Sequence, residues 1–187
     1  MNIGIDIDDT ITDTSEFLMP YVAKYLNLNI EKLNQKNITY DSFPIEYKGR
    51  EKEFGREIFE KVLTHVTLKK DAKEVISKLK SQGNKIIIIT ARDKSLYDEP
   101  FEFTSNQLSN LGIEYDKLFC TFNKRQVCID EKIDLFIDDN VNNLNSVEGI
   151  VSNIVLFNSK MNLKQDSNFK RVNCWKEIEE YIDNEIM

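Results

Sequence analysis

The segment Ile3-Gly4-Ile5-Asp6-Ile7-Asp8-Asp9-Thr10 constrains the fold more than any other part of the chain. Its apolar residues predict a buried strand over residues 2–7. Unpaired carboxylates are very costly to bury inside a sheet, so the three acids are expected at the carboxyl end of this strand. Ligands bind at that end in open α/β sheets. A hard divalent cation such as Mg²⁺ would be a suitable partner for carboxylate oxygens gathered there.

The rest of the chain alternates apolar runs with helical patterns, which predicts an α/β fold with a doubly wound parallel sheet. Further strands are expected at 85–90, 117–121, 134–139 and 153–157, and helices at 71–82, 101–111, 124–131, 141–148 and 175–185. Asp71 is expected to cap the first of these helices. The polar segment 158–174 is expected to be a loop.

Residues 14–68 interrupt this alternation between the first and second strands. Their apolar spacing predicts helices at 14–27 and 51–64, separated by an irregular segment. Pro20 falls inside the first of them, so a kinked helix and a turn followed by a helix are both open. We therefore expect a core formed by residues 1–13 and 69–187, with residues 14–68 inserted as a small helical cap.

The composition excludes several kinds of partner. A net charge of −7 argues against a nucleic-acid polymer or an anionic membrane surface. No apolar run approaches the roughly 20 residues of a membrane helix, and we expect no signal peptide before the first strand. The three cysteines lack Cys-x-x-Cys spacing, as expected for reduced thiols. We expect a cytoplasmic protein, with a homodimer left open.

Polar residues follow three of the predicted strands. Asp6 and Asp8 follow the first, Thr90 ends the second, and Asp138 and Asp139 follow a later one. Because parallel strands end at the same edge of a sheet, these side chains are expected to converge. Such a site suits Mg²⁺ together with a substrate phosphate. One aspartate can then attack phosphorus, while a second transfers protons.

A phosphate also needs hydrogen-bond donors and positive charge around its oxygens. Thr90 supplies a hydroxyl group, and Lys124, at the start of a predicted helix, is the preferred lysine. Lys117 and Lys132 are the alternatives. Arg92 lies two residues beyond Thr90 and is assigned to the phosphate site, with a surface position as the alternative.

These motifs resemble those of the haloacid dehalogenase superfamily of phosphohydrolases. The matching pieces, in the same order, are Asp6-x-Asp8-x-Thr10, the strand ending in Thr90, Lys124, and Asp138-Asp139. Thr90-Ala91-Arg92 and the segment 171–178 are similar to the 5′(3′)-deoxyribonucleotidase branch and its bacterial relatives. That resemblance implies a small helical cap after the first motif and the dephosphorylation of nucleoside monophosphates.

The resemblance also implies roles for the acids. Asp6 would be the nucleophile and Asp8 the general acid and base. Mg²⁺ would be held by Asp6, the backbone carbonyl of Asp8, and Asp138. Asp139 would orient Lys124 or a metal-bound water. Position 9 departs from the pattern, because many relatives have glycine where this chain has Asp9.

The phosphate and the substrate complete the comparison. By the resemblance, Thr90 and Lys124 would bind the transferring phosphate. The aromatic residues of the insertion are expected to pack in its own core, with stacking on a nucleobase as the alternative; they are Phe17, Tyr40, Phe43 and Tyr47. His65 is expected at the surface or at a hinge.

The expected function is therefore a Mg²⁺-dependent phosphomonoesterase that acts through an aspartyl-phosphate, with nucleoside monophosphates as preferred substrates. A phosphatase of sugar phosphates or other small metabolites is the alternative. A phospho-receiver domain or a metal-binding module without turnover is less favoured. In receivers the phospho-accepting aspartate lies on a later strand, whereas here Asp8 stands two residues from Asp6 as a ready acid and a helical insertion comes next.

Overall fold

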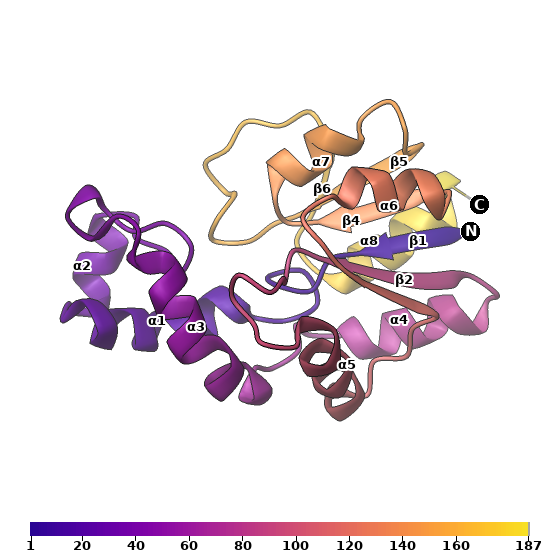
Figure 1. Cartoon of the computed structure of the whole chain (residues 1–187). Coiled ribbons are helices and arrows are strands. Elements are labelled where there is room, and N and C mark those ends of the chain that lie inside the picture. Colours follow the sequence, from indigo (N-terminus) through magenta and orange to yellow (C-terminus); the bar gives the residue numbers. More distant parts are fainter. Residues whose placement is uncertain (187) are drawn as a thin grey trace.

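The computed structural model describes residues 1–186 and shows two unequal parts (Figure 1). The larger part is a six-stranded sheet with helices on both of its faces. The smaller part is a group of helices that projects from one end of the sheet. The connection between the two parts lies just beyond the first strand, next to the acidic segment.

The six strands are all parallel, in the order β3-β2-β1-β4-β5-β6. They are β1 (Asn2–Ile5), β2 (Lys85–Thr90), β3 (Lys117–Cys120), β4 (Leu135–Asp138), β5 (Asn153–Phe157) and β6 (Lys170–Val172). The prediction of a doubly wound parallel sheet is confirmed. From β1 the chain first builds outward through β2 and β3, then returns to build outward through β4. The strand order therefore reverses between β1 and β4, and ligands bind at such a point in open α/β sheets.

Helices cover both faces of the sheet, as its buried strands require. One face packs against α4 (Ala72–Ser81), α5 (Pro100–Leu111) and α8 (Trp175–Tyr181), which continues as the π-helical turn η3 (Ile182–Ile186). The other face packs against α6 (Lys124–Asp130) and α7 (Val141–Val147). Among residues 1–186, no helix is long and apolar enough to cross a membrane.

Side chains of β1 and β2 alternate between these two layers. Ile86 and Ile88 join the first apolar cluster, whereas Ile87 and Ile89 join the second. Gly4 in β1 makes room for its neighbour, because a Cβ atom there would lie 2.9 Å from the ring of Phe136 in β4. The close packing of β1 against β4 brings the acids that follow these two strands together.

The insertion contains α1 (Thr14–Leu26), α2 (Ile30–Gln35) and α3 (Arg50–Val62), with short 3₁₀ turns η1 (Ile45–Tyr47) and η2 (Leu63–His65). These helices enclose an apolar cluster of their own, separate from the two clusters of the sheet. Helix α1 runs through Pro20 without interruption, so the alternative of a turn followed by a helix is wrong. The short helix α2 lies in a segment that was expected to be irregular.

Two further expectations are corrected. The segment 158–174 is not entirely loop, because β6 pairs with β5 at the edge of the sheet. Only Val172 of its three residues is buried, so the strand has almost no apolar pattern of its own. Asp71 stands at the N-cap position of α4, but its side chain makes no capping hydrogen bond. Its backbone is left-handed, with φ at 63°.

Candidate active site

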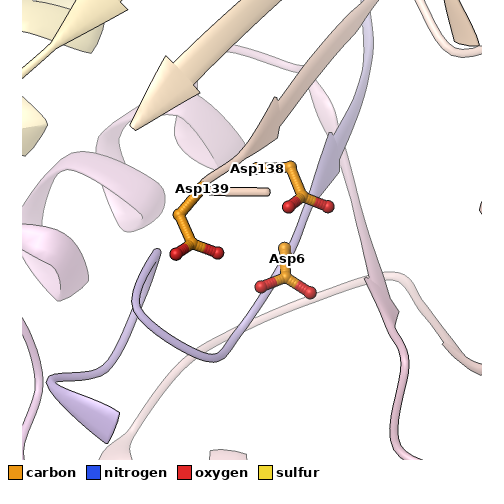
Figure 2. Close-up of side chains that lie close together, drawn as sticks. All are labelled: Asp6, Asp138 and Asp139. Atoms are coloured by element: carbon orange, nitrogen blue, oxygen red, sulfur yellow. The ribbon is translucent and has the colours of Figure 1, made fainter. Parts of the chain in front are cut away.

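Three carboxylates converge where β1 and β4 end. Asp6, Asp138 and Asp139 each offer an oxygen atom within 4.8 Å of the others, and all three residues are buried. Figure 2 shows the three side chains facing a common space beyond the ends of the two strands. The backbone N–H of Asp6 donates to Ile137 of β4 at 3.0 Å and so ties the acidic segment to the neighbouring strand. The predicted convergence of these acids is thus present in the structure.

Lys124, the first residue of α6, lies within this cluster. Its ammonium group donates to Asp6 Oδ1 at 2.5 Å and to Asp138 Oδ2 at 2.7 Å, and only 2% of its side chain is exposed. A buried lysine is rare unless it is paired in this way. The alternatives Lys117 and Lys132 both lie at the surface. The structure therefore places the preferred lysine among the acids.

One ammonium group does not balance three buried carboxylates. Burial, together with the charges of Asp138 and Asp8, raises the pKa of Asp6 to about 7, although Lys124 opposes this change. Burial and neighbouring carboxylates, Asp9 foremost, also raise the pKa of Asp139 well above its usual value. The cluster is short of positive charge, and its ligands are all oxygen atoms. These are the properties of a site that fits Mg²⁺.

The carboxylate of Asp138 is fixed by the start of α7. The backbone N–H of Asn140 donates to Asp138 Oδ1 at 2.8 Å, and the side-chain amide of Asn143 donates to Oδ2 at 3.0 Å. Asn140 is the N-cap of this helix, and its side-chain oxygen accepts from the backbone N–H groups of Asn142 and Asn143. Asn143 was missed from the sequence. The sequence signal for Asn143 is the run of polar residues after the strand that ends in acids. At the start of a helix that follows such a strand, the side chains of the first turn lie close to the end of the strand.

Asp139 has partners that the sequence did not suggest. Its carboxylate accepts from Ser159 Oγ at 2.8 Å, and its backbone carbonyl accepts from the amide of Asn162 at 2.6 Å. Both partners lie in the loop after β5. The hydrogen bonds of Lys124 go to Asp6 and Asp138 and not to Asp139, so of the two predicted roles of Asp139 the structure favours the orientation of a metal-bound water, which stays a prediction. Asp139 remains close enough to the other two acids to share a cation with them.

The side chain of Asp8 does not join the three clustered acids and pairs with Arg92 instead. The guanidinium group donates from Nε to Oδ2 at 3.0 Å and from Nη2 to Oδ1 at 2.8 Å, and Thr14 Oγ1 donates to Oδ1 at 2.8 Å. Although burial acts against the charge of Asp8, Arg92 and Thr14 hold its pKa below the usual value. Arg92 is buried, so the alternative of a surface position is wrong. A direct contact of Arg92 with phosphate stays a prediction.

Asp9 links the acidic segment to the insertion. Its backbone has φ at 60°, a left-handed conformation that glycine adopts without strain. Its carboxylate accepts from the backbone N–H of Ser15 at 2.8 Å and from the Ser15 hydroxyl. Burial raises the pKa of Asp9 to about 6, although both contacts with Ser15 oppose this change. The carboxylate thus satisfies a free N–H group in the first turn of α1, a structural role that glycine cannot supply.

Thr90 ends β2 beside the acid cluster. Its hydroxyl group is buried and has no hydrogen-bond partner among residues 1–186. Buried polar atoms in folded proteins nearly always have a partner. Three threonine hydroxyls among residues 1–186 have none, those of Thr10, Thr90 and Thr104, and of these only Thr90 ends a strand of the sheet. The position and the free hydroxyl agree with the predicted contact to a phosphate oxygen.

Comparison with known proteins decides the family. The family model for the cytosolic type C 5′ nucleotidases, "5' nucleotidase, deoxy (Pyrimidine), cytosolic type C protein", matches residues 1–186. The chain belongs to this 5′-nucleotidase family. Its members are hydrolases, and this chain has the haloacid dehalogenase-like fold that the sequence motifs predicted.

Relatives and solved structures agree with this assignment. The chain is similar to the Bacillus subtilis protein named "Putative nucleotidase YqfW", at 32% identity over 98% of this chain and 94% of the relative. It is similar to a nucleotidase of Clostridium acetobutylicum at 29% identity over the same shares of each chain. A haloacid dehalogenase-like hydrolase from Streptococcus pneumoniae has the same fold, with a TM-score of 0.66, 12% identity and 97% of each chain covered.

In this member of the 5′-nucleotidase family, the structure brings together most of the residues chosen from the sequence. Asp6, Asp138 and Asp139 surround Lys124, and Thr90 ends the neighbouring strand. The side chain of Asp8 joins its own pair with Arg92 at the edge of this group. His65 is exposed, as expected for a surface or hinge residue.

Proposed function

We propose that this hydrolase is a Mg²⁺-dependent phosphomonoesterase that dephosphorylates nucleoside monophosphates through an aspartyl-phosphate formed on Asp6. The observation that carries the proposal is the group of Asp6, Asp138 and Asp139 around the buried ammonium of Lys124. Packing alone gives no reason to bury so many charges together, since burying charges is unfavourable even when they are paired.

The chemistry follows from the two aspartates of the first motif. A carboxylate oxygen of Asp6 attacks phosphorus, and the bond from phosphorus to the nucleoside oxygen breaks. That oxygen takes a proton from Asp8 as the nucleoside leaves; Asp8 must take up this proton when the substrate binds, because Arg92 holds its pKa below the usual value in the free protein. Asp8 then accepts a proton from water as the water attacks phosphorus, and the bond between phosphorus and Asp6 breaks to release phosphate. General acid–base help of this kind contributes roughly 10²–10⁴-fold to the rate.

Mg²⁺ would be held by the carboxylates of Asp6 and Asp138 and the backbone carbonyl of Asp8, with Asp139 close enough to bind it or one of its waters. A bound Mg²⁺ would neutralise the acids, so that an anionic phosphate can approach Asp6. Thr90 and Lys124 would bind the transferring phosphate. The third N–H of Lys124 is not used by Asp6 or Asp138 and is free to serve it.

The insertion would act as a cap over this site. Its two connections to the core lie side by side, because the N–H of Asp13 donates to Thr67 at 3.0 Å and the N–H of Lys69 donates to Ile11 at 2.8 Å. This paired hinge supports a boundary between core and cap at residues 14 and 68. Closure of such a cap would exclude water from the reacting phosphate. The expected cytoplasmic location and a homodimer stay predictions.

A cavity between the cap and the core favours nucleotides over sugar phosphates. Its volume is about 460 Å³, and its walls include Tyr40 and Phe59 of the cap and Phe122 of the core. The Phe122 side chain is 63% exposed, although it is large and apolar, and it lies only two residues before Lys124. Aromatic faces of this kind stack on flat rings such as nucleobases. A sugar phosphate would leave them uncovered.

Phosphate release from a panel of substrates tests the proposed function. The panel contains nucleoside 5′- and 3′-monophosphates with ribose or deoxyribose, and the corresponding pentose phosphates without a base. We expect turnover of nucleotides in Mg²⁺ and none in EDTA. Turnover confined to pentose phosphates would replace the substrate proposal with the sugar-phosphate alternative. Stable phosphorylation by acetyl phosphate without turnover would point to a receiver instead.

Replacing Phe122 by alanine is expected to raise the KM for nucleoside monophosphates about 10-fold, because base–aromatic stacking contributes roughly 1–3 kcal/mol. The KM for 2-deoxyribose 5-phosphate is expected to stay within about twofold, since that substrate has no base to stack. Steady-state kinetics with both substrates measure the two values. Phe101→Ala is the matched control, because Phe101 is also an exposed phenylalanine of the core and does not line the cavity. Equal changes for both substrates would contradict a base site beside Phe122.

A further inference from the structure

A buried glutamine lies behind the ion pair of Asp8 and Arg92. Gln107 belongs to α5, and only 2% of it is exposed. Its side-chain oxygen accepts from Arg92 Nη1 at 2.6 Å, and its side-chain nitrogen donates to the backbone carbonyl of Leu63. It is not part of the acid cluster and contacts neither Asp6 nor Lys124. Both polar atoms of its side chain are nonetheless hydrogen-bonded.

Each nitrogen of the Arg92 guanidinium donates a hydrogen bond. Nε and Nη2 donate to the two oxygens of Asp8, and Nη1 donates to Gln107. The rings of Tyr97 and Phe103 flank the group, with their centroids 5.7 and 5.8 Å from its central carbon. These hydrogen bonds and the two rings restrict the position of Arg92. The direction in which Nε and Nη2 point toward Asp8 therefore depends on Gln107, the hydrogen-bond partner of Nη1.

The orientation of the Gln107 amide is set by its two neighbours. A guanidinium can only donate and a backbone carbonyl can only accept, so the amide must turn its oxygen to Arg92 and its nitrogen to Leu63. Leu63 follows the last residue of α3, where the cap leads back toward the core. The amide is thus anchored to a backbone atom that no side-chain rotation can move.

We propose that Gln107 is a positioning residue of the reaction: by fixing Arg92, it aligns the carboxyl group of Asp8 with the leaving oxygen of the substrate. This inference rests on the proposed function, because it assumes that Asp8 carries the proton to that oxygen. It adds a residue that acts through Arg92 and contacts neither the substrate nor the metal ligands. Loss of alignment is a large effect in catalysis, because displacements of about 1 Å reduce rates up to 10²-fold.

The test compares leaving groups in the first turnover of the Gln107→Met variant. Methionine keeps the size and lacks both hydrogen bonds. A nucleoside takes the proton of Asp8 and leaves as an alcohol, because its alkoxide is a poor leaving group, whereas p-nitrophenolate leaves readily without a proton. Rapid-quench measurements give the burst rate of product release from the best nucleotide of the panel and from p-nitrophenyl phosphate. We expect the nucleoside burst to slow about 10-fold and the p-nitrophenolate burst less than about twofold.

A second variant and a control separate positioning from packing. Gln107→Glu keeps the size, but its carboxylate competes with Asp8 for Arg92 and cannot donate to Leu63, so the same leaving-group dependence is expected. Thr104→Val is the control, because Thr104 is buried one turn earlier in α5 and its hydroxyl has no partner among residues 1–186. It is expected to leave both burst rates unchanged.

The outcomes are distinct. Slowing of the nucleoside burst alone in both Gln107 variants supports the inference. Equal slowing of both bursts, or no change in either, overturns it while the proposed function stands. A wild-type protein that releases neither product overturns the proposed function itself and the inference with it.

Discussion

Replacing Asp6 by asparagine is expected to reduce phosphate release by at least about 10⁴-fold, because the amide cannot form the covalent intermediate. The side chain keeps its size, so the fold and the position of Lys124 should be retained. Phosphate release from the best nucleotide in Mg²⁺ measures the effect. Asp13→Asn is a matched control, since Asp13 lies in the same segment, pairs with Lys69 at 2.9 Å and does not join the acid cluster. Near-normal turnover by Asp6→Asn would exclude Asp6 as the nucleophile.

The same substitution has an expected signature in stability. The pKa of Asp6 is about 7 in the folded protein, against the ordinary value of 3.8 expected in the unfolded chain. Between these values the native state binds more protons than the unfolded chain, so this residue makes stability fall as pH rises from 4 to 7. Asparagine does not ionise, so the variant does not lose stability in this way as pH rises. In EDTA at pH 8 the variant should be more stable than the wild type, by roughly 4 kcal/mol. Urea unfolding at pH 5 and pH 8 tests this, and a wild-type advantage at pH 8 would contradict it.

Replacing Lys124 by methionine is expected to lower both stability and activity. Removing one partner of a buried ion pair leaves the other charge uncompensated, at a cost of about 3–5 kcal/mol. Here two buried carboxylates, those of Asp6 and Asp138, lose their ammonium group. Phosphate release is expected to fall about 10³-fold, because the phosphate also loses a cation. Urea unfolding in EDTA and phosphate release in Mg²⁺ measure the two effects.

The loss of stability in Lys124→Met should be partly recovered by Mg²⁺, because a divalent cation among the three acids replaces the missing positive charge. Lys132→Met is the control, since Lys132 is exposed and is expected to change neither property beyond about 0.5 kcal/mol. A stability of Lys124→Met equal to that of the wild type in EDTA would mean that the cluster is not held together by this lysine.

Local sequence was sufficient for the strands that carry the site. The isoleucines of β2 face two different layers of helices, and this produces an unbroken apolar run that can be read without any structure. The failures occur where no such pattern exists. Strand β6 is short and polar at the edge of the sheet, and its position depends on β5 alone. Asp71 has the residue type of a cap and a backbone conformation that prevents capping.

The convergence of the catalytic candidates was determined by the sequence itself. Asp6, Thr90 and Asp138 each end an apolar run, and parallel strands must end at one edge of the sheet, so their meeting follows from the order of strands and helices. Lys124 could be chosen because it begins a helix that follows a strand, and the start of such a helix lies at the edge where the strands end. Both inferences follow from the hydrophobic periodicity of the elements and from the direction of the chain. Every residue of an apolar run contributes to that periodicity.

Only the tertiary structure decided which polar groups pair. Arg92 and Asp8 are 84 positions apart, and Gln107 reaches Leu63 across 44 positions. The pairing of Asp139 with Ser159 and the cavity between Tyr40 and Phe122 likewise join distant segments. Periodicity records which face of an element is buried, because burial is averaged over many residues. A hydrogen-bond partner depends on one distance and one angle, and these exist only after the chain has folded.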